Sequence, residues 1–299
     1  MSGKVDFYTQ IWANNVKTIL LFVVFFLIII GLGWIIGFFF DNIYVGLSIT
    51  LIVATLYSFI AYFAGSQIVL KLTGAREVTK AEYPYYVNTV EGLAIAAGLP
   101  TPKAYVIDTP ALNAFATGRN HNHAAVTVTT GLMEKLNREE LEGVVAHEIA
   151  HIKNLDIRTM LIAGVLVGIV VFLADFIFRV AIFGGGQRRS GGDGRAMLIL
   201  LVIGIILAIL APFVAYAIKL AISRKREYVA DAEGARLTRN PPALARALQK
   251  ISGDTHEFVQ ASSANEHMFI STPKTKSFFS KMFSTHPPIK ERIELLKNM

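Results

Sequence analysis

Long apolar runs set the pattern of hydrophobic and polar positions along this chain of 299 residues. A helix needs about 20 apolar residues to cross the roughly 30 Å of hydrocarbon in a bilayer. Four stretches reach that length and are predicted to be transmembrane helices, at residues 19–40, 45–64, 160–182 and 197–218. The first is too long for a signal-peptide core and lacks a clear small-residue cleavage site, so it is predicted to be a retained anchor.

The segments between these runs show the mixed patterns of an α+β domain. Residues 81–99 have helical periodicity, with Pro84 tolerable in the first turn. Three short runs rich in strand-forming residues, at 103–108, 112–117 and 124–130, predict a small β-sheet.

The sequence also predicts where a second helix of this domain begins. Asn137 followed by Glu140 is the pattern of a capping box, which places the first helical residue at Arg138. The helix is predicted to run past Asn154 and directly into the third apolar stretch.

The last third of the chain is predicted to be helical with one break. The helical pattern covers residues 224–238, stops at the Asn-Pro-Pro of 240–242, resumes over 243–251, and starts again at Pro287 or Pro288. The whole chain thus divides into a tail with a membrane hairpin, a helix–sheet–helix part, a second hairpin and a helical C-terminal part, at residues 1–72, 73–156, 157–222 and 223–299.

The composition agrees with a lipid environment, because 53% of the residues are hydrophobic, 17% are charged and the mean hydropathy is +0.49. Soluble domains carry about 25% charged residues, so an ordinary cytosolic enzyme is disfavoured. The absence of cysteine excludes disulfides and thiol nucleophiles, and it leaves His, Asp and Glu as the metal ligands.

The net charge of +7 is interpreted as the basic bias of cytoplasmic segments rather than as a nucleic-acid-binding surface. Residues 71–158 contain nine Lys and Arg, whereas the turn between the first two apolar stretches contains none. The tail, this segment and the C-terminal third are therefore predicted to be cytoplasmic. Arg188, Arg189 and Arg195, between the third and fourth stretches, oppose that count, so a shallow re-entrant hairpin stays open as an alternative.

The candidate chemistry lies in the helix that begins at Arg138, which contains His147-Glu148-Ile149-Ala150-His151. Residues four apart share a helix face, so both imidazoles can reach one ion, with Glu148 beside them to act as a base. Two incidental surface histidines are the alternative, and the apolar surroundings favour the metal site.

A catalytic zinc takes three protein ligands, and Glu227 is the best candidate for the third. It directly follows the fourth apolar stretch as the two histidines directly precede the third, so a membrane hairpin would bring them to one face. The alternative is a solvated carboxylate that pairs with the basic residues at 224–226. Asp231, one turn beyond Glu227, can accept a hydrogen bond from an imidazole, and Asn154 and Asp156 can serve similarly.

Several motifs, in this order along the chain, match those of a known family. They are His147-Glu148-Ile149-Ala150-His151 with Asn154 and Asp156, a membrane hairpin, Glu227-Tyr228-Val229-Ala230-Asp231, and Ser284-Thr285-His286-Pro287-Pro288. On these motifs the chain resembles, over nearly its whole length, the HtpX family of bacterial membrane zinc proteases, relatives of the CAAX prenyl proteases.

The resemblance implies a gluzincin-class protease domain that holds one zinc ion per chain. It implies that His147, His151 and Glu227 are the zinc ligands and that Glu148 is the general base. It also implies a place in the bacterial inner membrane and a role in the quality control of membrane proteins under stress.

Two further segments are candidates for substrate contacts. Asn113, Ala114 and Phe115 lie on a predicted strand, which is either a sheet edge that binds extended substrate or a plain core strand. His286 is either a donor to the oxyanion of the tetrahedral intermediate or a turn histidine.

The sequence therefore predicts an α-helical membrane protein with four transmembrane helices and a cytoplasmic zincin-like protease domain with a small β-sheet. Its partners would be the lipid bilayer and polypeptide substrates, membrane proteins above all, and not nucleic acid. One rival is a non-catalytic scaffold or chaperone whose structural metal is closed by a fourth ligand, Asp231 or His286. Another is a CAAX-type prenyl-protein protease, for which four spans are few to enclose a lipid chain.

Overall fold

The computed structural model describes residues 42–162, 224–256 and 287–299, with scattered positions between 12 and 37 and single residues at 202 and 270. Within these residues one helix, α2 (Ile43–Leu72), is long and apolar enough to cross a membrane. At 1.5 Å per residue its 30 residues span about 45 Å. It contains the predicted span 45–64, whereas the other three predicted spans fall largely outside the described residues.

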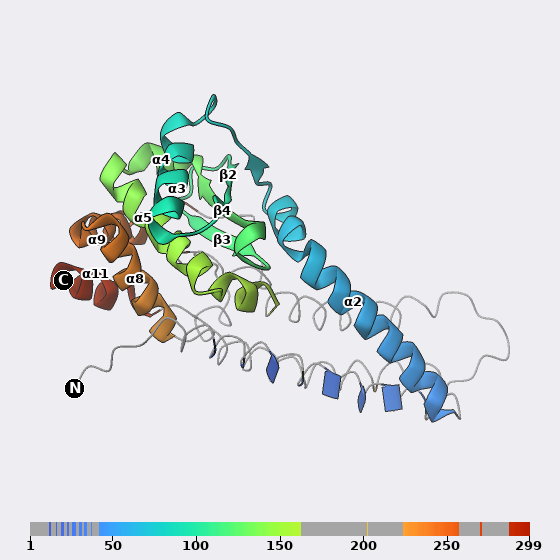
Figure 1. The fold of residues 1–299 in the computed structure, drawn as a ribbon. Helices are drawn as coiled ribbons and strands as arrows, with labels where there is room; N and C mark the ends of the chain where they lie inside the picture. The colour runs from blue at the N-terminus through green and yellow to red at the C-terminus, as the bar shows by residue number, and fades with distance from the viewer. Residues whose placement is uncertain are drawn as a thin grey trace.

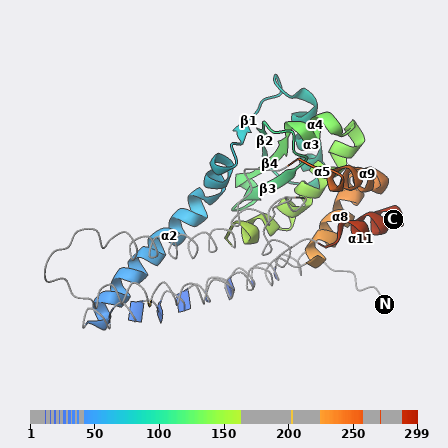
Figure 2. The ribbon, with the colours of Figure 1, turned by 180° about the vertical axis from the view of Figure 1, so that it is seen from behind.

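Helix α2 leaves its apolar surface uncovered. Figures 1 and 2 show it projecting away from the sheet and the other labelled helices. Only 6% of its most apolar stretch is buried, and Ile52, Leu56 and Phe59 are each more than half exposed. Such a surface is unfavourable in water and suits a hydrocarbon environment.

A four-stranded mixed sheet with the order β1-β2-β4-β3 forms the centre of the domain. Its strands are β1 (Arg76–Glu77), β2 (Lys103–Ile107), β3 (Ala114–Gly118) and β4 (Ala124–Thr129). The central pair, β2 and β4, is parallel, and the outer strands pair antiparallel with it. The three predicted strands are confirmed within two residues at each end, whereas β1 is too short to show an alternating pattern.

Helices α3 (Pro84–Ala97) and α5 (Arg138–Lys153) pack against each other and against this sheet. Pro84 begins α3, and Gly98, with a φ of 72°, ends it. The buried Tyr86 hydroxyl contacts the Val126 carbonyl oxygen at 2.8 Å, which joins α3 to a central strand. The core between these elements consists of aliphatic side chains such as Val90, Val126, Val144 and Ile149.

The predicted capping box at the start of α5 is present. The side chain of Asn137 accepts a hydrogen bond from the Glu140 amide at 2.9 Å, and Glu140 accepts one from the Asn137 amide at 2.9 Å. Lys250, from α9 (Pro241–Ser252), adds a 2.6 Å ion pair to the buried Glu140 carboxylate. Burial opposes ionisation of Glu140, but Lys250 and the Asn137 amide outweigh it, so its pKa lies below the usual value.

Replacing Glu140 with glutamine is expected to lower the free energy of unfolding at pH 7 by about 1–2 kcal/mol, because the ion pair to Lys250 is lost. A depressed carboxyl pKa stabilises the fold above the unfolded-state value of about 4.3 and stops doing so as the pH falls through the folded-state value. The difference should therefore shrink from pH 7 to pH 3 in denaturant unfolding followed by circular dichroism. Glu139→Gln, on the exposed face of the same turn, should change stability much less, and a difference independent of pH would contradict the assignment.

The prediction that α5 runs past Asn154 is wrong. The helix ends at Lys153, Asn154 caps it, and Leu155 has a positive φ of 56° before the helical conformation resumes at Asp156. In an unbroken helix a residue five positions after His151 would point about 140° away from it. The break instead turns Asp156 back toward His151.

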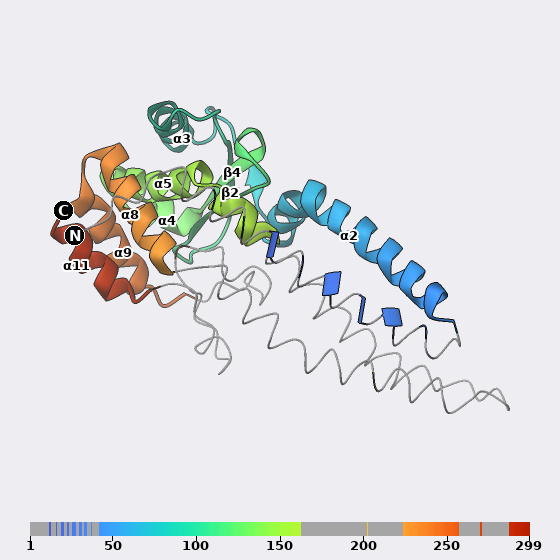
Figure 3. The same ribbon diagram turned by 60° about the horizontal axis from the view of Figure 1, so that its bottom comes forward.

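The other described helices are the short α4 (Thr130–Lys135), which follows β4, and three helices that lie beside α5 (Figure 3). Helix α8 (Arg224–Thr238) packs along α5, and α9 packs on α5 and on α11 (Ile289–Lys297). Figure 3 shows α8, α9 and α11 gathered beside α5, at the end opposite to α2. The helix predicted at 224–238 is confirmed, and α11 starts within two residues of the predicted proline pair.

Candidate metal centre

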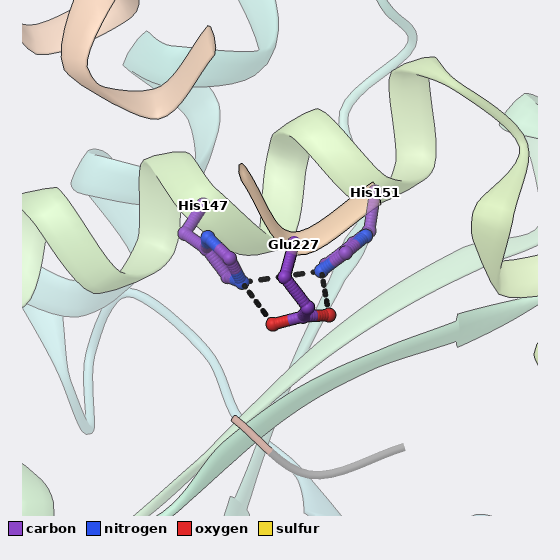
Figure 4. A group of neighbouring side chains, drawn as sticks. All are labelled: His147, His151 and Glu227. Atoms are coloured by element: carbon purple, nitrogen blue, oxygen red, sulfur yellow. Dashed lines mark hydrogen bonds and ion pairs between the residues drawn. The ribbon is translucent and has the colours of Figure 1, made fainter. Parts of the chain in front are cut away.

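Three buried side chains from two helices meet between α5 and α8. His147 and His151 come from consecutive turns of α5, and Glu227 comes from the first turn of α8 (Figure 4). The Nε2 atoms of the two imidazoles are 3.1 Å apart. The Glu227 carboxylate faces both, with Oε2 at 3.7 Å from His147 Nε2 and Oε1 at 3.5 Å from His151 Nε2.

The second nitrogen of each imidazole faces a carboxylate. His147 Nδ1 lies 3.0 Å from Asp231 Oδ1, and His151 Nδ1 lies 3.0 Å from Asp156 Oδ2. When each Nδ1 carries the proton and donates it to its carboxylate, the two Nε2 lone pairs point at each other. Two lone pairs facing each other repel, and a cation between them, either a proton on one nitrogen or a metal ion, removes that repulsion.

The spacing of the three groups fits a small tetrahedral metal ion. Nitrogen and oxygen ligands at about 2.1 Å from such an ion stand about 3.4 Å apart. The observed separations of 3.1, 3.5 and 3.7 Å bracket that value. With two imidazoles and one carboxylate, these residues can hold a divalent metal.

The surrounding carboxylates favour a positive charge at this point. Burial opposes protonation of His151, but Asp156 and Glu227 outweigh burial and raise its pKa to about 9. Burial lowers the pKa of His147, although contact with the Asp231 carboxylate acts in the opposite direction. A buried site that raises the proton affinity of one imidazole in this way also attracts a metal cation.

Glu148 lies beside the metal-binding group without belonging to it. Its side chain is buried, and burial raises its pKa to about 7, with a further contribution from the charge of Glu227. The backbone N–H of Ala116 in β3 donates a hydrogen bond to this carboxylate. A carboxylate with a pKa close to neutral is suited to take up and release a proton.

Comparison with known proteins decides the family. The model of peptidase family M48 matches residues 81–299. This chain belongs to peptidase family M48. It is 44% identical over 294 residues to the protease HtpX homolog of Dictyoglomus turgidum, which covers 98% of this chain and 95% of that protein. It is 43% identical over 295 residues to that of Tropheryma whipplei strain Twist, with 98% of each chain covered.

Among solved structures, the crystal structure of S. mikatae Ste24p matches this fold with a TM-score of 0.52 and 21% identity. The match covers 96% of this chain and 66% of that one. At this identity the likeness concerns the fold alone. The chain is thus a metallopeptidase of family M48, with a small mixed sheet beside the helix that carries the histidines.

The edge of the sheet in this M48 domain lies next to Glu148. Strand β3 is the outer strand, and it pairs with β4 on one side only. Its residues 114 and 116 direct backbone polar groups to the other side, where the Ala116 N–H meets Glu148 and the Ala114 carbonyl oxygen accepts from Ile270 N at 2.9 Å. Asn113, whose side chain accepts from the Ala114 amide at 2.9 Å, and Phe115 are buried. Among the described residues β3 thus lies at the end of the strand order, with all five of its residues buried.

The other predicted site residues have different positions. Asp231 and Asp156 contact the imidazoles, whereas Asn154 is buried at the end of α5 as its cap. His286 lies outside the described residues. Arg292 of α11, which the sequence analysis did not single out, is fully buried against Asp231 and Glu227. A sequence signal exists, because Arg292 stands one turn after Ile289 and one turn before Leu296, on the apolar face of its helix.

A glycine permits the close approach of α8 to the histidines. A Cβ atom at Gly234 would lie 3.0 Å from the backbone nitrogen of His147 and 3.2 Å from its Cα. Both contacts are tighter than normal packing and involve backbone, so Gly234→Ala is expected to push α8 off α5 and to destabilise the fold by about 1–3 kcal/mol. Gly92→Ala in α3, where a Cβ meets nothing within 4 Å, should raise stability by up to about 1 kcal/mol. Melting temperatures of both variants check this contrast, and equal shifts would contradict it.

Proposed function

We propose that this chain is a membrane-bound, zinc-dependent endopeptidase in which His147, His151 and Glu227 hold the zinc. The single observation that carries the proposal is the pair of buried Nε2 atoms 3.1 Å apart, each backed by a carboxylate on Nδ1 and both facing Glu227. Two imidazoles and a carboxylate form the ligand set of a catalytic zinc, which keeps one position open. Bound zinc supplies a Lewis acid that activates water and polarises the scissile carbonyl.

Glu148 is the general base in this proposal. It takes the proton of the attacking water and returns it to the leaving amine, as its buried position beside the metal-binding group allows. The hydrogen bond from the Ala116 amide holds it at the strand edge, where a bound peptide would pass.

We infer that the outer edge of β3 binds the substrate as an additional strand. The Ala114 carbonyl oxygen accepts a hydrogen bond there from the Ile270 amide, and a bound substrate would replace this contact with one from its own backbone. A substrate aligned there would bring its scissile carbonyl toward Glu148 and the metal centre. We further propose His286 as a donor to the developing oxyanion, a role that rests on the sequence motif alone.

The substrates proposed are misfolded or damaged membrane proteins, cut at the cytoplasmic face of the bacterial inner membrane. The relatives are bacterial proteins named as protease HtpX homologs, and the uncovered apolar surface of α2 supports membrane attachment. The abundance of basic residues at 71–158, which carry the metal-binding helix, supports the cytoplasmic orientation.

The rival with a structural metal needs a fourth protein ligand. Asp231 is poorly placed for that role, because one of its oxygens contacts His147 Nδ1 and both contact Arg292. In the part of the chain that the structure describes, the metal-binding group contains three residues. Three protein ligands would leave a coordination position for water, as a catalytic site requires, and His286, the rival's other fourth ligand, lies outside the described residues.

Zinc content and casein cleavage of the full chain, purified in detergent with a chelator and then given zinc, test the proposal. We expect about one zinc per chain and cleavage that appears only after zinc is restored. Zinc binding without cleavage of casein or of unfolded membrane proteins would favour the structural-metal rival. Cleavage that persists in the chelator would contradict the metal mechanism itself.

A further inference from the structure

We propose that Arg292 is a positioning residue of the metal centre, through which helix α11 orients both His147 and Glu227. The inference rests on the proposed function, since it concerns the same zinc site. It adds a fourth helix-borne group to that site, from the last helix of the chain, about 65 residues beyond Glu227 along the sequence.

Arg292 forms two parallel contacts with the carboxylate of Asp231. Its Nε lies 2.8 Å from Oδ2 and its Nη2 lies 2.7 Å from Oδ1 of the carboxylate. The side chain of Arg292 is 0% exposed and that of Asp231 3% exposed, so no water competes for the pair. A planar guanidinium fixes both position and orientation of a carboxylate in this geometry, which a lysine ammonium does not.

Asp231, held in this orientation, in turn orients a metal-binding imidazole. Its Oδ1 atom, which Arg292 holds, also lies 3.0 Å from His147 Nδ1. The carboxylate keeps the proton on Nδ1, so the lone pair is on Nε2, which lies 3.1 Å from His151 Nε2 and 3.4 Å from Arg292 Nη2. The rotation of the His147 ring is therefore set by a residue of α11.

The same guanidinium contacts the third metal-binding residue. Arg292 Nη1 lies 3.1 Å from Glu227 Oε2, while Oε1 of that carboxylate faces His151. One side chain thus fixes two of the three groups relative to each other. The other imidazole has a carboxylate partner of its own, because His151 Nδ1 lies 3.0 Å from Asp156, whose Oδ1 has Arg226 Nε at 3.4 Å.

A role confined to holding α11 on α8 would require only a favourable polar contact anywhere between these helices. The chain has such a contact nearby, since the Tyr228 hydroxyl donates to Glu291 Oε2 at 2.7 Å on the exposed side. Glu291 therefore offers a matched control on the adjacent position of α11. It joins the same two helices and does not reach the metal-binding atoms.

The test measures the dissociation constant of zinc for the full chain in detergent, by competition with a chromophoric chelator, beside the melting temperature. Arg292→Lys keeps the charge but cannot bridge both carboxylates, so we expect zinc to bind about 10–100-fold more weakly. Glu291→Gln should leave zinc affinity unchanged. Equal zinc affinity of wild type and Arg292→Lys, even with a lowered melting temperature, would overturn the positioning role.

A double-mutant cycle shows whether Arg292 acts through Asp231. Asp231→Asn with Arg292→Gln removes both charges of this ion pair, and of the two carboxylates that Arg292 contacts only Glu227 keeps its charge, so this variant keeps the test open if Arg292→Gln alone does not fold. We expect the double variant to bind zinc more tightly than the product of the two single effects predicts, because the part of the Arg292 effect that acts through Asp231 is already lost in Asp231→Asn. Single effects that multiply fully would overturn action through Asp231. A wild type that binds no zinc would instead overturn the proposed function, which separates the two failures.

Discussion

Glu148→Gln is expected to lower kcat/KM for casein cleavage by about 10²–10⁴-fold while zinc stays near one per chain. Glu148 lies next to His147 but is not one of the three residues whose ligand atoms converge. Glutamine has the same shape and still accepts the Ala116 amide hydrogen bond, so the fold and the metal site should persist. Glutamine lacks a carboxylate that can accept a proton. The carboxylate of Glu148, whose pKa burial raises to about 7, can accept one.

Zinc content and initial rates of casein cleavage, measured on the same preparations, check this expectation. Glu139→Gln is the matched control, because it removes a carboxylate from the same helix on its exposed side, two turns before the histidines. This control should retain wild-type zinc content and rate. A Glu148→Gln enzyme that cleaves at the wild-type rate would rule out Glu148 as the base.

Glu227→Gln is expected to weaken zinc binding by more than about 100-fold and to abolish cleavage at zinc concentrations that saturate the wild type. The substitution removes the carboxylate that faces both Nε2 atoms, and it leaves Nη1 of the buried Arg292 beside a neutral amide. The loss should be larger than that from Asp231 or Arg292, because those two residues act on the metal through a ligand.

Competition with a chelator measures the zinc dissociation constant of Glu227→Gln, and high zinc should rescue part of the activity. Glu233→Gln is the control within α8, because Glu233 pairs with Lys153 and Arg236 and does not reach the imidazoles. Contacts with Arg236 and Lys153, working against burial, lower the pKa of Glu233 to about 2, so its loss should reduce stability without changing zinc affinity. Unchanged zinc binding in Glu227→Gln would mean that another residue is the third ligand.

Local signals account for the features that the sequence predicts well. The capping box at Asn137 and Glu140, the four-residue spacing of His147 and His151, and the apolar length of α2 each lie within one element. Their physical basis is helix geometry and the solvation of backbone groups, which act within a few turns. The metal-binding helix can therefore be predicted from the sequence before any packing is known.

Other predictions failed or were incomplete where packing overrides the local preference. Leu155 has a positive φ of 56°. No residue pattern predicts this conformation, because it is unfavourable for leucine and its energetic cost must be offset by the surrounding contacts. The break brings Asp156 within 3.0 Å of His151. A continuous helix would have placed that carboxylate far from the imidazole.

The sequence by itself determined the apolar helix, the small sheet, the histidine pair and Glu227 as the candidate third ligand, since each follows from spacing along one element or from the hairpin between two. Only the tertiary structure decided that β3 is the outer strand beside Glu148 and that Arg292 lies on Asp231, 61 residues away along the chain. Those contacts depend on how α5, α8 and α11 pack together. The packing of these helices depends on many contacts between residues that are far apart in the sequence. The pattern within a single segment does not include those contacts and therefore cannot predict the packing.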